Sequence, residues 1–277
     1  MALKISPKRL TNSLHVKQHL RFSPDGNELV YARTIGAYIR LIKIKSGGTE
    51  EQFLFPDRKE DFIQQHPAWS PDAKQLAFTI NVGRRTGRIG IHRCDASGMT
   101  FSNFRDWLTG GQDSHPGWSP DSKRVVFMAK NLRVMMADAD GKNRRQIGPS
   151  EGLQGQPCWS PDGMRIAFSS SHAGNIDVYT MKPDGTDLVR LTNSPRRDFR
   201  PVYSPDGQWI AFTSTRDGNY ELYLMRPDGS ELRNLTQHPS LNDHAAWSPD
   251  SRELAFISTR DGGYDLYSMP VVDERQF

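Results

Sequence analysis

Four of the chain's eight histidines stand at one position of a repeated motif. This position lies four residues before the serine of a Ser-Pro-Asp string, and its six occupants are His19, His66, His115, Gln156, Arg200 and His244. Neutral imidazoles are common ligands of divalent transition metals such as zinc, manganese, iron or nickel. If the repeats surround an axis, each supplies one ligand at a similar height and radius. Three interpretations stay open: a metal site of the four histidines, an anion site of histidines and Arg200, and a structural role in which the imidazoles cap incoming strands.

A second polar set lies two residues before the first in each repeat. Its members are Lys17, Gln64, Asp113, Gln154, Asp198 and Asn242. We expect Asp113 and Asp198 to lie on the same loops as the histidines, as carboxylate ligands or as partners that orient the imidazoles. Gln156, Arg197 and Arg200 complete the predicted ligand-binding set, because neighbouring cations on one loop can bind a carboxylate or phosphate. A merely solvated loop is the alternative for these cations.

No catalytic residue is predicted from a motif. The string 148–152 matches the G-x-S-x-G pattern of a nucleophile elbow. That elbow requires a strand before it and a helix after it, whereas this string connects two expected strands. The sequence also lacks a phosphate-binding loop, a dinucleotide-binding glycine pattern and an H-E-x-x-H zinc motif.

The elements that must position these residues follow from the repeat itself. Ser-Pro-Asp occurs six times, with its serine at Ser23, Ser70, Ser119, Ser160, Ser204 and Ser248. An aromatic residue precedes each serine, and an apolar triplet ending in an aromatic follows, as in Ile210-Ala211-Phe212. Short apolar β-formers bounded by Pro, Asp and Gly predict strands joined by tight turns. Tandem four-stranded units of about 40–50 residues are typical of propeller blades. The sequence therefore predicts an all-β, six-bladed β-propeller of four-stranded antiparallel blades, with blade motifs starting near residues 19, 66, 115, 156, 200 and 244.

The two ends of the chain are expected to meet in one blade. The sixth repeat lacks the fourth strand of the others, while Lys8–Ser13 resembles the Val189–Ser194 segment that ends the fourth repeat. We therefore predict that residues 6–13 complete blade six, so that the amino-terminal strand closes the ring. This organisation makes residues 1–277 a single domain.

Composition excludes several classes of protein. The formal net charge of +4 is spread over interleaved acidic and basic residues, which makes nucleic acid a poor partner. No apolar run approaches the roughly 18 residues of a membrane helix, so no membrane span is expected. The two cysteines, Cys94 and Cys158, have no paired spacing and indicate neither a disulfide nor a zinc site. The amino-terminal residues do not resemble a secretory leader, so we expect a cytoplasmic protein, or a periplasmic one if a leader was removed. We also expect a monomer.

The repeated aromatic-Ser-Pro-Asp string, the Ile-Ala-Phe type of triplet and the Asp-Leu-Tyr type of strand resemble the TolB-like propeller repeat, a relative of WD-repeat blades. The resemblance covers essentially the whole chain. It implies a bacterial protein-binding propeller, since TolB belongs to a periplasmic cell-envelope complex and carries an additional amino-terminal α/β domain. Similar propellers also occur in peptidases and in oligogalacturonate lyases, which bind a metal through His and Gln side chains.

Two functions from different classes remain. The first is a non-catalytic binding propeller that presents its channel face to a protein or peptide partner. The alternative is a metal-dependent lyase or hydrolase that acts on an anionic saccharide, or another anionic small molecule, through the histidine ring. Metal content discriminates between them.

Overall fold

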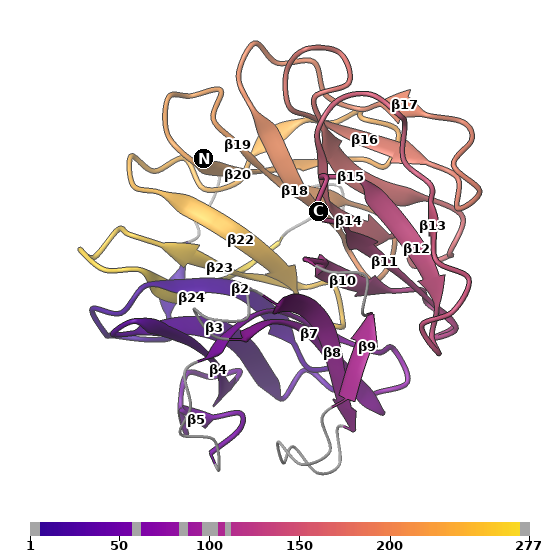
Figure 1. Ribbon diagram of the computed structural model, residues 1–277. Helices are drawn as coiled ribbons and strands as arrows, with labels where there is room; N and C mark the ends of the chain where they lie inside the picture. Colours follow the sequence, from indigo (N-terminus) through magenta and orange to yellow (C-terminus); the bar gives the residue numbers. More distant parts are fainter. Residues whose placement is uncertain (1–5, 57–61, 83–87, 96–104, 109–111, 272–277) are drawn as a thin grey trace.

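The computed structural model describes residues 6–56, 62–82, 88–95, 105–108 and 112–271, which form β-strands and turns around a common axis (Figure 1). The first two repeats form β2 (Lys17–Phe22), β3 (Glu28–Ile35), β4 (Tyr38–Lys45), β5 (Gln52–Phe53), β6 (Phe62–Trp69), β7 (Gln75–Val82), β8 (Arg88–Asp95) and β9 (Arg105–Leu108). The third and fourth form β10 (Ser114–Trp118), β11 (Arg124–Met128), β12 (Val134–Asp138), β13 (Arg145–Gln146), β14 (Gln154–Trp159), β15 (Ile166–Ser170), β16 (Asp177–Met181) and β17 (Val189–Arg190). The last two form β18 (Asp198–Tyr203), β19 (Ile210–Ser214), β20 (Glu221–Met225), β21 (Arg233–Asn234), β22 (Asn242–Trp247), β23 (Glu253–Ser258) and β24 (Asp265–Pro270), and β1 (Lys8–Arg9) joins the final sheet.

The prediction of six separate blades is wrong. Within the described residues the strands form five blades, of which four are four-stranded and one contains eight strands. The eight-stranded blade holds the first two repeats, because β4 and β6 pair in parallel at Ile39 and Ile63. Both of these strands are eight residues long, whereas β12 and β14 have five and six residues. The longer strands extend far enough to meet, so the seam between these two repeats is bridged by backbone pairing.

The Ser-Pro-Asp string forms the turn between the first two strands of each repeat. In the fifth repeat, Ser204 Oγ donates to Asp206 Oδ1 at 2.6 Å and accepts a hydrogen bond from Trp209 N at 2.9 Å. Asp206 Oδ1 also accepts from Gln208 N at 3.0 Å, and Gly207 adopts a φ of 71°. The serine and aspartate therefore satisfy turn backbone groups, as expected for these residue types.

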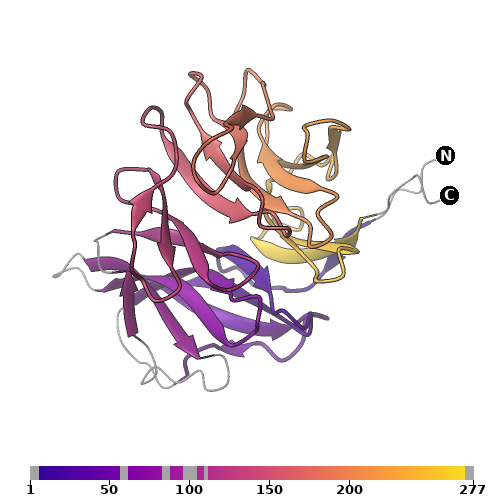
Figure 2. The same cartoon turned by 90° about the vertical axis from the view of Figure 1, so that its right-hand side faces the viewer.

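The motif aromatics lie between neighbouring repeats and hold them together. Trp118 Nε1 donates to Ala68 O at 3.1 Å, and Trp247 Nε1 donates to Val202 O at 3.2 Å, each across to the preceding repeat. Trp247 also packs among buried residues of that repeat, including Leu222. The core is thus a series of apolar layers between sheets that follow one another around the molecule (Figure 2).

Strand β1 pairs antiparallel with β24, with Lys8 opposite Ser268. The buried Asp265 carboxylate joins this pair to the first repeat. Its Oδ1 accepts from Thr11 Oγ1 at 2.7 Å and from Lys17 Nζ at 2.9 Å. The two ends of the ring are therefore connected both by backbone pairing and by a buried ion pair.

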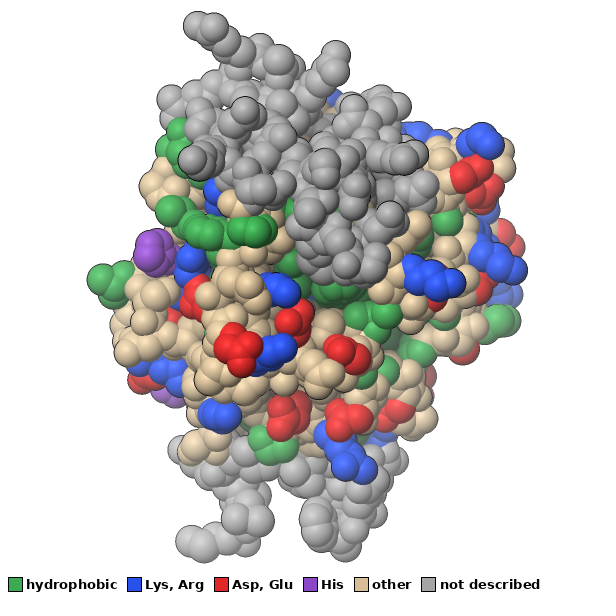
Figure 3. All heavy atoms as spheres, turned by 90° about the horizontal axis from the view of Figure 1, so that it is seen from below, with side chains coloured by type: hydrophobic (Ala, Val, Ile, Leu, Met, Phe, Trp, Pro, Cys, Tyr) green, Lys and Arg blue, Asp and Glu red, His purple; other side chains and the backbone are tan. Residues whose placement is uncertain are grey.

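Surface charge is mixed. Figure 3 shows acidic and basic side chains interspersed over one face of the molecule. None of the described residues forms a helix with the length and hydropathy that a membrane crossing requires.

Candidate functional site

The six residues of the predicted ring share an uncommon backbone conformation. Their φ angles lie between 53° and 57°, in the left-handed region, in His19, His66, His115, Gln156, Arg200 and His244. The innermost strand pair of each repeat also shifts register at this residue, as between Gln65 and Ala68. A non-glycine residue in this conformation costs on the order of 1 kcal/mol. The recurring bulge turns each side chain out of the pleat and toward the channel.

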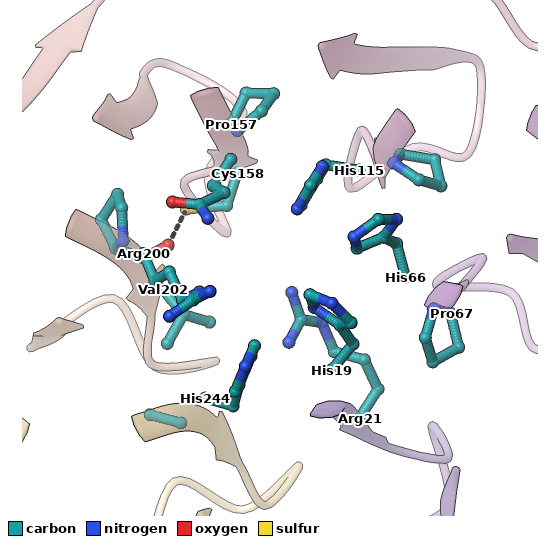
Figure 4. Close-up of a pocket in the computed structure, with 14 residues that line it drawn as sticks. His19, Arg21, His66, Pro67, His115, Pro157, Cys158, Arg200, Val202 and His244 are labelled. Atoms are coloured by element: carbon teal, nitrogen blue, oxygen red, sulfur yellow. Dashed lines mark hydrogen bonds between the residues drawn. The ribbon is translucent and has the colours of Figure 1, made fainter. Parts of the chain in front are cut away.

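The four imidazoles converge in this channel (Figure 4). Ring centroids are 3.5 Å apart between His66 and His115, and 4.0 Å apart between His19 and His66. His244 lies on the other side of His19, with 4.5 Å between their centroids. The side chains surround a cavity of about 50 Å³, which has room for an ion and a few water-sized groups.

Burial keeps these histidines neutral. Loss of solvation lowers the pKa of His115 to about 3 and that of His244 to about 4. The same effect, strengthened by neighbouring imidazoles, holds the pKa values of His19 and His66 well below the ordinary value. All four rings are therefore free bases at neutral pH, which is the form that binds a metal.

Three of the histidines could share one ion. The ligand nitrogens of His19, His66 and His115 all lie within 4.8 Å of one another. With metal–nitrogen bonds of about 2.0–2.1 Å, two nitrogens on one zinc ion are at most about 4.2 Å apart. Small side-chain rotations therefore bring all three into range. The donor set and its neutrality fit a divalent transition metal.

Hydroxyl groups fix the orientation of several ring members. His66 Nδ1 is 3.0 Å from Thr79 Oγ1, so an Nδ1–H that donates to this hydroxyl leaves the Nε2 lone pair available. His115 Nδ1 lies 3.1 Å from Ser114 Oγ. Gln156 Oε1 accepts a hydrogen bond from Ser169 Oγ at 3.3 Å. Such partners hold ligating side chains in one orientation.

Arg200 reaches the channel but is already paired, because its Nη1 donates to Asp243 Oδ2. Arg197 is exposed and lines an adjacent groove instead of the ring.

The structure does not bring Asp113 and Asp198 to the histidines. Both carboxylates are fully buried within the blades and engaged by arginines. Asp113 Oδ1 accepts from Arg144 Nη2 at 2.8 Å, and Asp198 Oδ2 accepts from Arg216 Nη2 at 2.7 Å. Residues two apart share one face of a regular strand, but the bulge breaks that alternation, so these acids point away from the channel.

Sequence reasoning missed Arg21, which lines the channel beside His19 (Figure 4). It stands two residues before its motif serine, where the other repeats carry Ala68, Gly117, Cys158, Val202 and Ala246. The sequence feature that could have identified Arg21 is a long cationic side chain at a repeat position that the other repeats fill with small or apolar residues.

An apolar groove adjoins the ring. Its volume is about 350 Å³, and it shares His115, Gln156 and Arg200 with the channel. Leu153, which is 54% exposed, and Tyr220, which is 37% exposed, contribute to its wall.

Comparison with known proteins places this fold among TolB-like propellers. Residues 113–233, less than half of the chain, match the family model described as the TolB beta propeller domain. The structure of a putative TolB from Agrobacterium tumefaciens aligns with 95% of this chain and 93% of its own length, at 21% identity and a TM-score of 0.74. TolB from Acinetobacter baumannii aligns over 92% of this chain and 63% of its own, at 22% identity and a TM-score of 0.65.

A structure described as oligogalacturonate lyase in complex with manganese also shares the fold, with 15% identity, a TM-score of 0.63 and coverage of 97% and 94% of the two chains. No curated protein matches the sequence. At these identities the structural likenesses concern the fold, so the chain has a TolB-like propeller fold.

Proposed function

We propose that this protein is a binding propeller whose channel holds a divalent transition metal and whose channel face binds a protein or peptide. The observation that carries the metal assignment is the convergence of three neutral imidazoles, His19, His66 and His115, with nitrogens within 4.8 Å. These side chains come from three different repeats, and each occupies a strained backbone position. A metal held by these residues would supply Lewis-acid chemistry toward an anionic group. The manganese in the structurally similar lyase supports testing manganese first.

The apolar groove supports the peptide-binding part of the proposal. It opens beside the ring and exposes Leu153 and Tyr220 next to the cationic Arg197. An extended segment with an apolar side chain fits such a groove, because apolar burial supplies affinity while polar groups fix orientation. A ligand in the groove also reaches the ring through the residues that the two cavities share.

Metal content tests this proposal directly. Protein purified without an affinity tag or chelator is analysed for metals, then stripped and titrated with Mn²⁺, Zn²⁺ and Ni²⁺ by calorimetry. We expect one ion per chain, and His66→Ala lowers the affinity at least tenfold. His15→Ala, at an exposed histidine outside the ring, is the matched control and binds normally. Failure of all three ions to bind the wild-type protein would refute the metal assignment.

A lyase acting on an anionic saccharide is the second candidate, and His244 is the observation that favours it. This fourth imidazole adjoins the three-histidine cluster, and its pKa of about 4 makes it a free base at neutral pH. His244 would accept the proton that an elimination requires, and a metal held by the histidine cluster would supply Lewis-acid stabilisation of the substrate carboxylate. Incubation with oligogalacturonate and Mn²⁺, followed by absorbance of the unsaturated product, separates the candidates. Turnover by the wild-type protein that is lost in His244→Gln supports the lyase function. If the wild-type protein shows no turnover, the binding function remains.

A further inference from the structure

Arg21 is the cation of the channel that has no counter-charge among the described residues. Its side chain projects from β2 into the channel cavity beside His19 (Figure 4). Within the described chain its guanidinium makes one hydrogen bond, from Nη1 to Leu20 O at 2.9 Å. A guanidinium has five N–H donors, so most of its hydrogen-bonding capacity faces the cavity.

The other arginines near buried carboxylates show what Arg21 lacks. Arg144, Arg190, Arg200 and Arg216 each contact an aspartate within its blade or across a seam. For Arg21, no carboxylate of the described residues lies within ion-pair distance. A guanidinium without an ion-pair partner keeps its donors available to an anion that enters the channel.

Arg21 is an exposed side chain that lines the channel cavity. Desolvation by the surrounding protein lowers its pKa. The guanidinium nevertheless stays protonated at any physiological pH. The cavity of about 50 Å³ admits only a small group beside it.

The charges around the cavity favour a single negative charge. Arg200 is paired with Asp243, so Arg21 is the cavity-lining cation without an ion pair among the described residues. In the metal-free channel, one carboxylate matches this single unpaired cation.

The walls favour a planar group with an apolar attachment. Pro67, Pro116, Pro157 and Pro201 line the cavity together with Val202. Proline has no N–H to offer, so the side-chain donors of the cavity are those of Arg21, Gln156, Arg200 and the imidazoles. A carboxylate accepts two parallel hydrogen bonds from a guanidinium.

We propose that Arg21 anchors the carboxylate group of a ligand in the channel, with or without a metal at the histidine ring. This goes beyond the metal assignment, because the anchor is a cation that binds no metal. When an ion occupies the ring, the same carboxylate relieves the repulsion between that ion and Arg21.

The test uses metal-free, chelator-treated protein, so its result does not depend on the metal proposal. Binding of ¹³C-labelled acetate is followed through the line width of its carboxyl resonance, at constant ionic strength maintained with chloride. We expect saturable broadening in the wild type, at least a tenfold loss of affinity in Arg21→Met, and a smaller loss in Arg21→Lys. Phosphate and sulfate compete more weakly than formate.

Arg252→Met is the matched control, since it removes an exposed cation from a surface turn that lines neither the channel nor the groove and leaves acetate binding unchanged. Thermal unfolding confirms that each variant is folded, and if Arg21→Met fails to fold, Arg21→Gln replaces it. Two results overturn the proposal: absence of saturable acetate binding to the wild type, or equal binding by folded Arg21 variants that lack the charge.

Discussion

Acidification between pH 7 and pH 5 should destabilise the metal-free protein through its histidine ring. The pKa values of His115 and His244 are lowered to about 3 and about 4, chiefly by burial. In the unfolded chain each has an ordinary pKa of about 6.5. As pH falls below that value, the unfolded state binds protons that the folded state does not accept. Stability therefore decreases as pH falls through this window, until the folded-state pKa values are reached.

The magnitude follows from the difference between the two states. At pH 5, protonation of a histidine with a pKa of about 6.5 stabilises the unfolded state by about 2 kcal/mol, and His115 and His244 together contribute about 4 kcal/mol. The result barely changes if either folded-state value shifts, provided that it stays below pH 5. A loss of this size is a large part of a typical unfolding free energy of about 5–15 kcal/mol.

Urea unfolding at pH 7 and pH 5, in chelator, measures this effect. Carboxylates do not interfere with this measurement, as Asp250 shows. Its hydrogen bond from Ser248 lowers its pKa, so the stability that Asp250 contributes is lost only as pH falls below the ordinary value of 3.8. The double variant His115→Gln and His244→Gln places the residue type of Gln156 at both positions and should lose about half of the pH dependence, because His19 and His66 remain. His15→Gln should retain it. Unchanged pH dependence in the double variant would mean that these imidazoles are solvated in the folded protein.

Three other perturbations test the architecture by urea unfolding. Asp265→Ala leaves the buried Lys17 ammonium without its carboxylate and should cost about 3–5 kcal/mol, whereas Asp184→Ala, at an exposed turn, should cost less than about 1 kcal/mol. Similar losses for both would show that burial of the Lys17 pair is unimportant. Trp247→Ala should cost about 3–5 kcal/mol through a cavity between repeats, and a neutral result would contradict its packing against the preceding sheet. Deletion of residues 6–13 removes β1 and should lower the unfolding midpoint, while an unchanged midpoint would mean that the pairing with β24 does not hold the ring.

Much of the strand pattern could be read from the sequence, because each local signal recurs with the same physical cause. The triplet Ile210-Ala211-Phe212 lies fully buried in β19, as its apolar run and flanking turns predict. The number of blades could not be obtained in this way. Joining of the first two repeats depends on strands that continue beyond the motif and meet at Ile39 and Ile63. A repeat count contains no information about such an extension.

Recurrence in the sequence predicted some residues of the candidate site but not others, because it does not report local backbone geometry. Recurrence identified the histidine position correctly as one that faces the channel. It failed for Asp113 and Asp198, because a bulge separates them from the ring residues and reverses their direction. It also missed Arg21, since a search for shared residues passes over the single repeat that differs from the others.

The backbone conformation of the six ring residues argues against a role in packing alone. Glycine adopts the left-handed conformation without steric cost, and Gly207 does so in a turn of the fifth repeat, which also contains Arg200. At the ring position, however, the chain carries four histidines, a glutamine and an arginine. Each combines backbone strain with partial burial of a polar group, and both effects oppose folding. A packing role would be served by smaller side chains with neither penalty. The recurrence of polar side chains at this strained position therefore supports a ligand in the channel, which would bind the imidazole nitrogens and the guanidinium donors that remain available.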